Sequence, residues 1–457
     1  MVTWHELDAR SWAQAAAEYG AEAGVRASLA RIEQLNPRYR AFNLVLAEQA
    51  VATARALDAL PASERGPLHG VPVAIKDEND VAGTVTSFGT ACNSTPKSAD
   101  SLTVSRLRQA GAIIIGKTTM PAFGAFPITS SEAFGITPNP HNVAFTAGGS
   151  SGGSAVALAT GMVPLALGGD GGGSIRIPAD RCGLVGFKPA RGAVPTAPYD
   201  HLWHDLGTAG PIARTVRDAE LMYRIISGAA GGPRQVPQAG RPLRVGVSLA
   251  PASALARLDL AHCRAIWQAA QALRQAGHTV TYLPGRLPDP TLPFMVQFFA
   301  GLGDEIRALE STDSLEGLHR HTLALGFWAR GRILQAAKDA GRRLGARLEA
   351  TYFEGYDLLL TPTTANRPPA ADQLQGVGWG AAGFVRAMVQ AVPSAVYTLP
   401  WNVSGHPALA VPAGYAEDGL PVSVQLIAPL KKQGLGDLFS LGADLHRRLA
   451  GPGSEDP

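Results

Sequence analysis

Two short segments rich in glycine and serine stand out, because a serine hydroxyl can act as a nucleophile. Residues 148–154 read Gly-Gly-Ser-Ser-Gly-Gly-Ser, and residues 168–174 read Gly-Gly-Asp-Gly-Gly-Gly-Ser. A serine becomes nucleophilic when a nearby base accepts its proton. Successive glycines can turn several backbone N–H groups toward one point and so stabilise an oxyanion. The second segment, which ends in Ser174, therefore predicts acyl transfer through a serine.

The residues between the two segments predict that Ser174 approaches Ser150. An apolar helix that ends at Gly161 follows the first segment, and a strand over 163–167 leads into the second. About ten helical residues advance roughly 15 Å, and about five strand residues return roughly 16–17 Å. The second loop therefore returns to the level of the first. A short helix that ends near Gly183 adds positive partial charge at its N-terminus, close to Ser174.

Lys76 is the candidate base, because it closes a short apolar strand over 71–76. A lysine kept neutral by burial can accept a proton without a histidine. Other interpretations stay open on these residues alone. The segments could be flexible connections, or a phosphate cradle, although no Gly-Lys-Ser/Thr ending is present. Residues 148–152 also fit the GxSxG pattern of an α/β-hydrolase-type serine esterase, although a loop and not a strand precedes them.

Three ordered motifs together resemble the amidase signature family: residues 70–77, residues 148–154, and residues 168–179 with Cys182-Gly183. The resemblance is close over 8–230, returns at 402–405 and 419–421, and is weakest over 285–395. It implies an α/β fold with a large mixed, mostly parallel sheet flanked by helices on both faces. It also implies that Ser174 is acylated, that Ser150 follows a cis peptide bond and relays the proton, and that Lys76 is the final base.

The resemblance also implies residues that surround this triad. Backbone amides of the second loop form the oxyanion hole, polar neighbours support it, and a segment before the first loop contacts substrate. The residues are Gly171, Gly172 and Gly173 for the oxyanion hole, Asp170, Arg176 and Ser151 for support, and Phe126, Ile128 and Thr129 for substrate binding. Three positions depart from the family's usual residues: Gly169 (often Ser or Thr), Ser131 (commonly Asn) and Thr119 (frequently Asn). These departures leave the triad intact and the substrate preference open.

The substrate is left open among anilides, aliphatic amides, carbamates and cyclic amides, with ester hydrolysis as an added activity. Aromatic residues at helical spacing favour a region that caps the site and binds an apolar acyl or aryl group, although the same pattern is typical of plain core packing. They are Phe294, Phe298, Phe299, Phe327, Trp328, Trp379, Phe384 and Tyr397. Two other functions stay open: an A-type subunit of an RNA-linked amidotransferase that acts in a complex, and a binding protein without catalysis.

The chain is expected to form one domain over residues 1–457. Its parts are an N-terminal helical arm (1–62), a catalytic core (65–230), a linker (231–242), a variable capping region (285–400) and a return to the core (401–450). Helices are expected at 9–35 and 44–60, and strands at 357–361 and 420–427. Strand-helix-strand patterns at 71–76, 101–109 and 112–116, and at 243–247, 261–275 and 278–283, predict parallel pairing.

The composition fits an enzyme that acts on a small molecule. Lys plus Arg number 40 against 37 Asp plus Glu, a net charge of +3, which favours neither nucleic acid nor a membrane as a partner. Three cysteines spaced far apart, Cys92, Cys182 and Cys263, favour no disulfide framework and no metal pair. The first residues lack the pattern of a signal peptide. We therefore expect a cytoplasmic monomer or homodimer that uses no cofactor and no metal.

Overall fold

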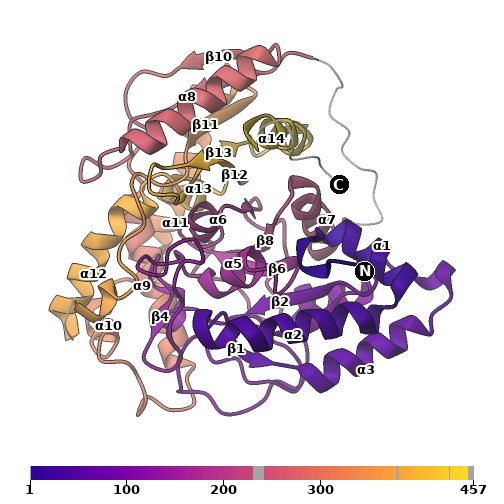
Figure 1. The fold of residues 1–457 in the computed structure, drawn as a ribbon. Coiled ribbons are helices and arrows are strands. Elements are labelled where there is room, and N and C mark those ends of the chain that lie inside the picture. The colour runs from indigo at the N-terminus through magenta and orange to yellow at the C-terminus, as the bar shows by residue number, and fades with distance from the viewer. Residues whose placement is uncertain (1, 230–240, 377–379, 432, 451–457) are drawn as a thin grey trace.

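The computed structural model describes residues 2–229, 241–376, 380–431 and 433–450. Its main feature is an eleven-stranded sheet with helices packed against it (Figure 1). This confirms the predicted α/β class and the large mixed sheet. Most of the predicted linker, residues 231–240, and Trp379 of the aromatic set lie outside the described residues.

The N-terminal arm contains three helices, where the sequence pattern predicts two. They are α1 (Ala9–Tyr19), α2 (Ala21–Tyr39) and α3 (Ala47–Asp58). The prediction of one helix over 9–35 is wrong, because Gly20 adopts a φ of 95° and breaks it. The second helix then continues through Pro37 and ends where Arg40 takes a left-handed conformation.

The sheet has the strand order β1-β3-β2-β6-β8-β7-β12-β13-β11-β9-β10. A separate two-stranded hairpin is formed by β4 (Ser130–Ser131) and β5 (Gly135–Ile136). The bounds of the sheet strands are β1 Phe42–Val45, β2 Pro72–Lys76, β3 Ile113–Thr118, β6 Leu165–Asp170, β7 Val185–Lys188, β8 Thr208–Ala213, β9 Arg244–Val247, β10 Thr279–Tyr282, β11 Leu358–Pro362, β12 Ala408–Tyr415 and β13 Pro421–Ile427.

Parallel pairing occurs in two groups of three strands. One group is β3-β2-β6 and the other is β11-β9-β10. Both predicted strand-helix-strand units lie in these groups, joined by α4 (Leu102–Gln109) and α8 (Leu260–Gln275). The pairs between the groups, from β6-β8 to β13-β11, are antiparallel, as is β1-β3. The antiparallel centre arises because β8 lies between β6 and β7 and is antiparallel to both, and because β12 and β13 pair as a hairpin. The strand-helix-strand pattern does not reveal either arrangement.

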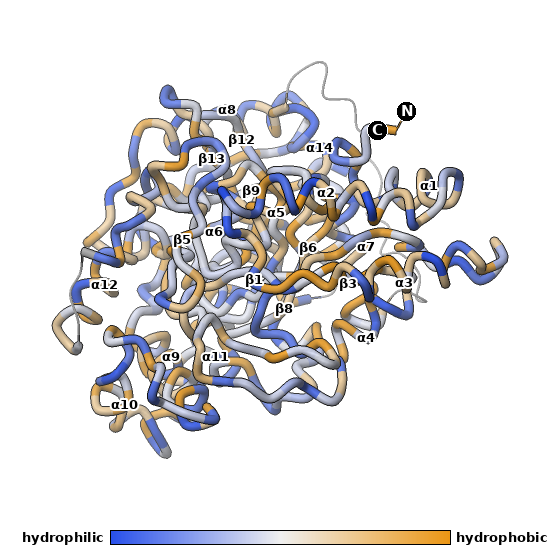
Figure 2. The backbone as a smooth tube through the Cα atoms, turned by 60° about the horizontal axis from the view of Figure 1, so that its bottom comes forward, coloured by the Kyte–Doolittle hydropathy of each residue, from blue (hydrophilic) through white to orange (hydrophobic). Residues whose placement is uncertain are grey.

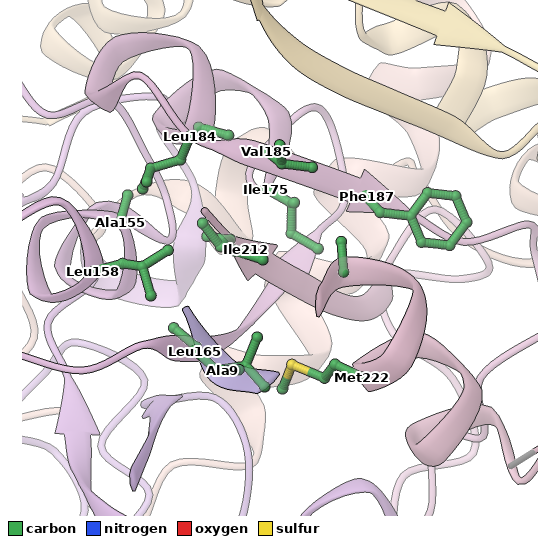
Figure 3. Packing of buried hydrophobic residues seen from close by; sticks show 14 of the residues in the cluster. Ala9, Ala155, Leu158, Leu165, Ile175, Leu184, Val185, Phe187, Ile212 and Met222 are labelled. Carbon is green, nitrogen blue, oxygen red and sulfur yellow. The ribbon is translucent and has the colours of Figure 1, made fainter. Parts of the chain in front are cut away.

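The middle of the sheet is a dry apolar core. Every residue of β2, β6 and β13 is buried, and Figure 2 shows β3 and β6 among the most hydrophobic parts of the tube. In Figure 3, Leu165 of β6, Ile212 of β8 and Phe187 of β7 lie near Leu158 of α5 (Gly152–Ala159) and Met222 of α7 (Val216–Ser227). Burial of apolar surface stabilises the folded chain by about 25 cal/mol per Å². The core therefore supports the loops that follow β2 and β6 in fixed positions.

The region 285–400 contributes a group of helices at one end of the molecule, away from α1 and α3 (Figure 1). They are α9 (Thr291–Arg307), α10 (Thr322–Leu325), α11 (Gly331–Leu348) and α12 (Gly380–Ala395), followed by α13 (Leu399–Ser404). The last helix, α14 (Gln433–Ala450), packs on β12. Among the described residues, no helix combines the length and the apolar character needed to cross a membrane.

Candidate active site

Lys76 and Ser150 are brought together from two neighbouring elements. Lys76 is the last residue of β2, and Ser150 lies in the loop before α5. The Lys76 Nζ donates a hydrogen bond to the Ser150 Oγ over 2.8 Å and a longer one to the carbonyl oxygen of Gly169 over 3.3 Å. Both side chains are buried, and the peptide bond between Gly149 and Ser150 is cis. The structure thus places the predicted base within hydrogen-bonding distance of the predicted relay serine.

Ser174 lies in the turn between β6 and α6 (Arg176–Cys182). The Ser151 N–H donates to the carbonyl oxygen of Ser174 over 3.1 Å, and the Ser151 hydroxyl bonds both backbone groups of Gly169 at 3.2 Å. These contacts fasten the two serine loops to each other. In this described region, no hydrogen bond joins the hydroxyls of Ser150 and Ser174 directly. A proton path from Ser174 to Lys76 therefore requires a hydroxyl rotation that brings the two serines into contact.

Asp170 and Arg176 form a buried, two-pronged ion pair beneath Ser174. The Arg176 Nε lies 2.9 Å from Oδ2 of Asp170, and Nη2 lies 3.0 Å from Oδ1. Burial alone would raise the pKa of Asp170, but the charge and hydrogen bonds of Arg176 hold it well below its ordinary value. The same carboxylate accepts from the N–H groups of Gly173 (2.7 Å) and Ile175 (3.2 Å). Asp170 thus holds the backbone of the glycine loop in place.

Three further residues complete this network, and the sequence motifs alone gave none of them a role. Asn402 donates to Asp170 Oδ1 over 2.8 Å and accepts from Arg176 over 2.7 Å, while Gln425 accepts from Arg176 over 3.0 Å. Thr398 donates to the carbonyl oxygen of Gly172 over 2.7 Å. These residues follow the glycine loop by more than 200 positions, so only the fold brings them to it. The motif at 402–405 is the one sequence signal that points to this part of the chain.

The glycine loop leaves a subset of its amides free to bind an oxyanion. The N–H of Gly173 is already engaged by Asp170, so it supports the loop instead. In the described structure, the N–H groups of Gly171, Gly172 and Ser174 donate to no protein acceptor. Gly173 adopts a φ of 123°, and a Cβ there would lie 2.3 Å from the Thr398 Oγ1, so no other residue fits.

Three buried lysines lie in this part of the molecule, and they differ in the groups that they contact. Lys117 pairs with Asp77 at 2.5 Å, and Lys188 donates to the carbonyl oxygen of Pro189 at 2.8 Å. Burial lowers the pKa of both. Neither of these two lysines bonds a serine. Lys76 is therefore the lysine whose geometry suits proton exchange with Ser150.

A cavity of about 490 Å³ opens beside Ser174. Its walls come mainly from α9 and α12 and from residues 124–127, and they are almost entirely apolar. Phe126 lines the cavity as predicted for a substrate contact. Within the described chain, Ile128 and Thr129 are not part of the lining. Thr129 instead donates to the carbonyl oxygen of Gly148 at 2.9 Å and accepts from the N–H of Gly152 at 3.1 Å, which holds the first serine loop.

The predicted aromatic residues divide into two groups. Four line the cavity: Phe294, Phe298, Phe299 and Phe384. Trp328 packs behind Phe299, the Tyr397 hydroxyl donates to the backbone of Leu249, and Phe327 is 73% exposed. The helices of this region thus supply both a cavity wall and ordinary packing.

Comparison with known proteins decides the family. The amidase family model matches residues 23–433. The chain belongs to the amidase signature family. AmiB2 of Mycobacterium tuberculosis is 40% identical to this amidase over 406 residues, which cover 87% of each chain. The 6-aminohexanoate-cyclic-dimer hydrolase of Paenarthrobacter ureafaciens is 30% identical over an alignment of 485 positions, gaps included, which covers 98% of this chain and 95% of that protein.

Solved structures agree with this assignment. A 6-aminohexanoate cyclic dimer hydrolase in complex with substrate superposes on the amidase with a TM-score of 0.89 at 27% identity, covering 98% of each chain. A bacterial aryl acylamidase of the amidase signature family gives a TM-score of 0.81 at 26% identity, covering 98% of this chain and 97% of that one. The protein is therefore an amidase-signature hydrolase that acts on amides.

One group of side chains in the amidase resembles a metal site, which the spacing of the sequence does not predict. His201, His204 and Asp304 offer three ligand atoms that lie within 4.8 Å of one another. The His204 Nε2 is already 2.7 Å from Asp304, whose other oxygen bonds Arg307. The group is separate from the hydrogen bonds around Lys76 and Ser150. A positively charged arginine on the shared carboxylate opposes a cation there, because like charges repel.

Proposed function

We propose that this amidase hydrolyses amides through an acyl-enzyme on Ser174, with Ser150 as the proton relay and Lys76 as the base. One observation carries the proposal: the 2.8 Å hydrogen bond from Lys76 to Ser150, directly beside a serine at the mouth of a cavity. A nucleophile next to a base that a third group orients is the arrangement nucleophilic catalysis requires.

The proposed reaction has two halves. The Ser174 Oγ attacks the amide carbon while its proton passes to the Ser150 Oγ and the Ser150 proton passes to the Lys76 Nζ. The tetrahedral oxyanion accepts hydrogen bonds from the free amides of the glycine loop. The proton then returns through Ser150 to the leaving nitrogen, and the amine departs. Water attacks the acyl-enzyme along the same proton path and releases the acid.

We also propose that the acyl or amine part of the substrate is apolar or aryl. The cavity of about 490 Å³ has walls of phenylalanine, methionine and valine, and its one charged lining residue, Asp289, is solvent-exposed. A charged group placed against such walls would lose its hydration without gaining a partner. The similar proteins named above act on a cyclic dimer and, by name, on aryl acylamides, so anilides and cyclic amides are the first substrates to test. Aliphatic amides, carbamates and activated esters follow them.

The test combines a substrate screen with labelling of the nucleophile. The full chain is assayed with chromogenic amides, carbamates and esters, and is then treated with a fluorophosphonate. We expect mass spectrometry to find the adduct on Ser174 and Ser174→Ala to lack turnover. An adduct on Ser150 with an active Ser174→Ala variant would contradict the proposal and favour the esterase interpretation. Turnover that survives a chelator agrees with the metal-free mechanism.

The second candidate function is that of an A-type amidotransferase component acting in a complex. It rests on the structural similarity to the A-type component of a glutamyl-tRNA(Gln) amidotransferase from Thermotoga maritima, with a TM-score of 0.76 at 25% identity, 96% of this chain and 94% of that one. This TM-score is below those of the amide hydrolases named above. A protein of this kind would hydrolyse little in isolation and would copurify with partners, so the same screen separates the two functions.

A further inference from the structure

We propose that Glu78 is a positioning residue for the base, and that Gly169 is a glycine because the Glu78 carboxylate occupies the place of a side chain there. This inference rests on the proposed role of Lys76. Glu78 follows β2 by two residues, and its Oε2 lies 2.7 Å from the Lys76 Nζ. The lysine side chain is 2% exposed and that of the glutamate 20%. Lys76 therefore has three oxygen partners: the Ser150 hydroxyl, the Gly169 carbonyl and the Glu78 carboxylate.

The position of Gly169 shows how closely the carboxylate fits. A Cβ added to Gly169 would lie 1.6 Å from Oε1 of Glu78, and the three nearest atoms to it all belong to that carboxyl group. Gly169 lies in strand β6, opposite Ala209, and has no left-handed φ that would itself demand glycine. The need for glycine at this position therefore comes from Glu78. Any side chain at 169 would push the carboxylate off the lysine.

Two other titratable groups, Glu305 and Tyr199, face this pair. Glu305 on α9 lies close enough to both residues to interact with their charges, and its Oε1 accepts from the Trp203 indole at 2.7 Å. Burial raises the pKa of Glu305 to about 8, so this carboxyl is largely neutral at pH 7. Tyr199 also interacts with Glu78, and its hydroxyl donates to Asp80 at 3.0 Å. Among the described residues, Glu78 is therefore the carboxyl group in direct contact with Lys76.

The geometry defines what Glu78 does in the reaction. Lys76 becomes an ammonium when it takes the Ser150 proton, and a carboxylate 2.7 Å away stabilises that charge as it forms. Glu78 thus supports the rate at alkaline pH and moves the acidic limb of the pH profile upward.

The experiment compares Glu78→Gln with wild type on one chromogenic amide across pH 5 to 10. The amide side chain keeps the length and a hydrogen-bond acceptor but removes the charge. We expect the acidic limb of kcat/KM to move down by about one pH unit or more and the alkaline plateau of kcat to fall about tenfold. Glu22→Gln, which removes an exposed carboxylate from Arg26 and Arg55, is the control and should leave both unchanged.

A double-mutant cycle tests the role of Gly169. Gly169→Ala alone should move the acidic limb in the same direction as Glu78→Gln and lower the Tm. In a Glu78→Ala background, which removes the obstructing carboxylate, Gly169→Ala should have almost no further effect on either. Additive effects in the cycle, or a Glu78→Gln profile identical to wild type, would overturn the inference. A wild-type chain that hydrolyses no amide and takes no label on Ser174 would instead overturn the proposed function.

Discussion

The candidate site has a polar part, called the floor here, around Lys76, Asp170 and Arg176, and an apolar part, called the wall, formed by α9 and α12. The two parts are built in opposite ways. In the floor, fully buried ionisable side chains such as Lys76, Asp170 and Arg176 each have several partners at defined distances. In the wall, α9 and α12 present side chains such as Phe294, which is buried, and Val389, which is 59% exposed, without hydrogen bonds to hold them. The floor can therefore hold reacting atoms in one geometry, whereas the wall selects by size and shape.

This difference has an energetic basis. Removing one partner of a buried ion pair leaves an uncompensated charge and typically costs about 3–5 kcal/mol. Exchanging one apolar side chain for another of similar volume usually costs less than about 1.5 kcal/mol. Substitutions in the buried ion pair of the floor, Asp170 with Arg176, should thus affect every substrate and stability together, and substitutions in the wall should affect substrates selectively.

The largest effect should follow removal of the nucleophile or the base. We expect Ser174→Ala to lower kcat for amides by about 10⁴-fold or more, and Lys76→Ala to lower it nearly as much, because the leaving nitrogen then receives no proton. Activated esters, whose leaving groups need no proton, should lose far less activity in Lys76→Ala. Parallel assays of an anilide and a nitrophenyl ester measure this. Equal losses on the two substrates would mean that the lysine has a structural role.

The second prediction tests the floor through stability. Asp170→Asn leaves Arg176 buried without its anion and should lower the free energy of unfolding by about 3–5 kcal/mol. Because Arg176 keeps the pKa of Asp170 below its ordinary value, this contribution is present above about pH 4 and is lost as the pH falls further. Urea denaturation of both proteins at pH 7, at pH 4 and at about pH 3 measures it, and the difference between them should shrink only at the lowest pH. Breaking the exposed pair of Glu22 and Arg26 is the control and should leave the midpoint almost unchanged.

The floor and the wall also differ in how far the sequence predicts them. Lys76, Ser150 and Ser174 stand in short motifs, so the sequence singles them out. Spacing predicts that the two serine loops approach each other, and the family resemblance groups Lys76 with them. Glu78 and Asn402 show the limit. The contact of Glu78 with Lys76, two residues earlier, depends on the turn after β2 and on the space left at Gly169. The contact of Asn402 with Asp170 depends on a helix more than 200 residues away. Spacing along the chain alone predicts neither contact.

The helices and strands likewise divide into those that local sequence patterns predict and those that they do not. The parallel units around α4 and α8 are local patterns, and the structure has them where they are predicted. The antiparallel strands β7, β8 and β12 are assembled from distant segments, and their short, Gly- and Pro-containing sequences lack a clear period. The break at Gly20 is a further case, because the helical pattern continues on both sides of a glycine whose left-handed φ ends the first helix.

The third prediction concerns the wall. Phe294 lines the cavity, and its ring would contact a Cβ placed on Gly172 at 3.2 Å, so it borders the glycine loop that binds the oxyanion in the proposed mechanism. Phe294→Leu should change the ratio of kcat/KM between an aryl and a small aliphatic amide by about tenfold with little change in Tm. Phe327→Leu, at an exposed site of the same region, is the matched control. A uniform loss of all activities together with a lower Tm would mean that Phe294 is only part of the core.

The last prediction concerns how a buried histidine behind the wall makes stability depend on pH. His319 is buried against the rings of Phe123, Phe126 and Phe384, and burial lowers its pKa to about 3. The unfolded chain binds a proton near pH 6.5 that the folded chain does not accept. Stability should therefore fall by about 1.4 kcal/mol for each pH unit from about 6.5 toward 3 through this residue.

His319→Leu should reduce this loss of stability in acid, as urea midpoints at pH 7, 6 and 5 would measure. Glu316, in the same segment, gives a control of opposite sign. Burial raises its pKa to about 7, so the folded chain binds a proton that the unfolded chain releases, and this contribution grows as the pH falls toward about 4.5. Glu316→Gln should therefore make the loss in acid steeper where His319→Leu makes it shallower. If the urea midpoints of both variants change with pH as those of the wild type do, neither His319 nor Glu316 contributes to the pH dependence of stability. That dependence would then come from other groups in the protein.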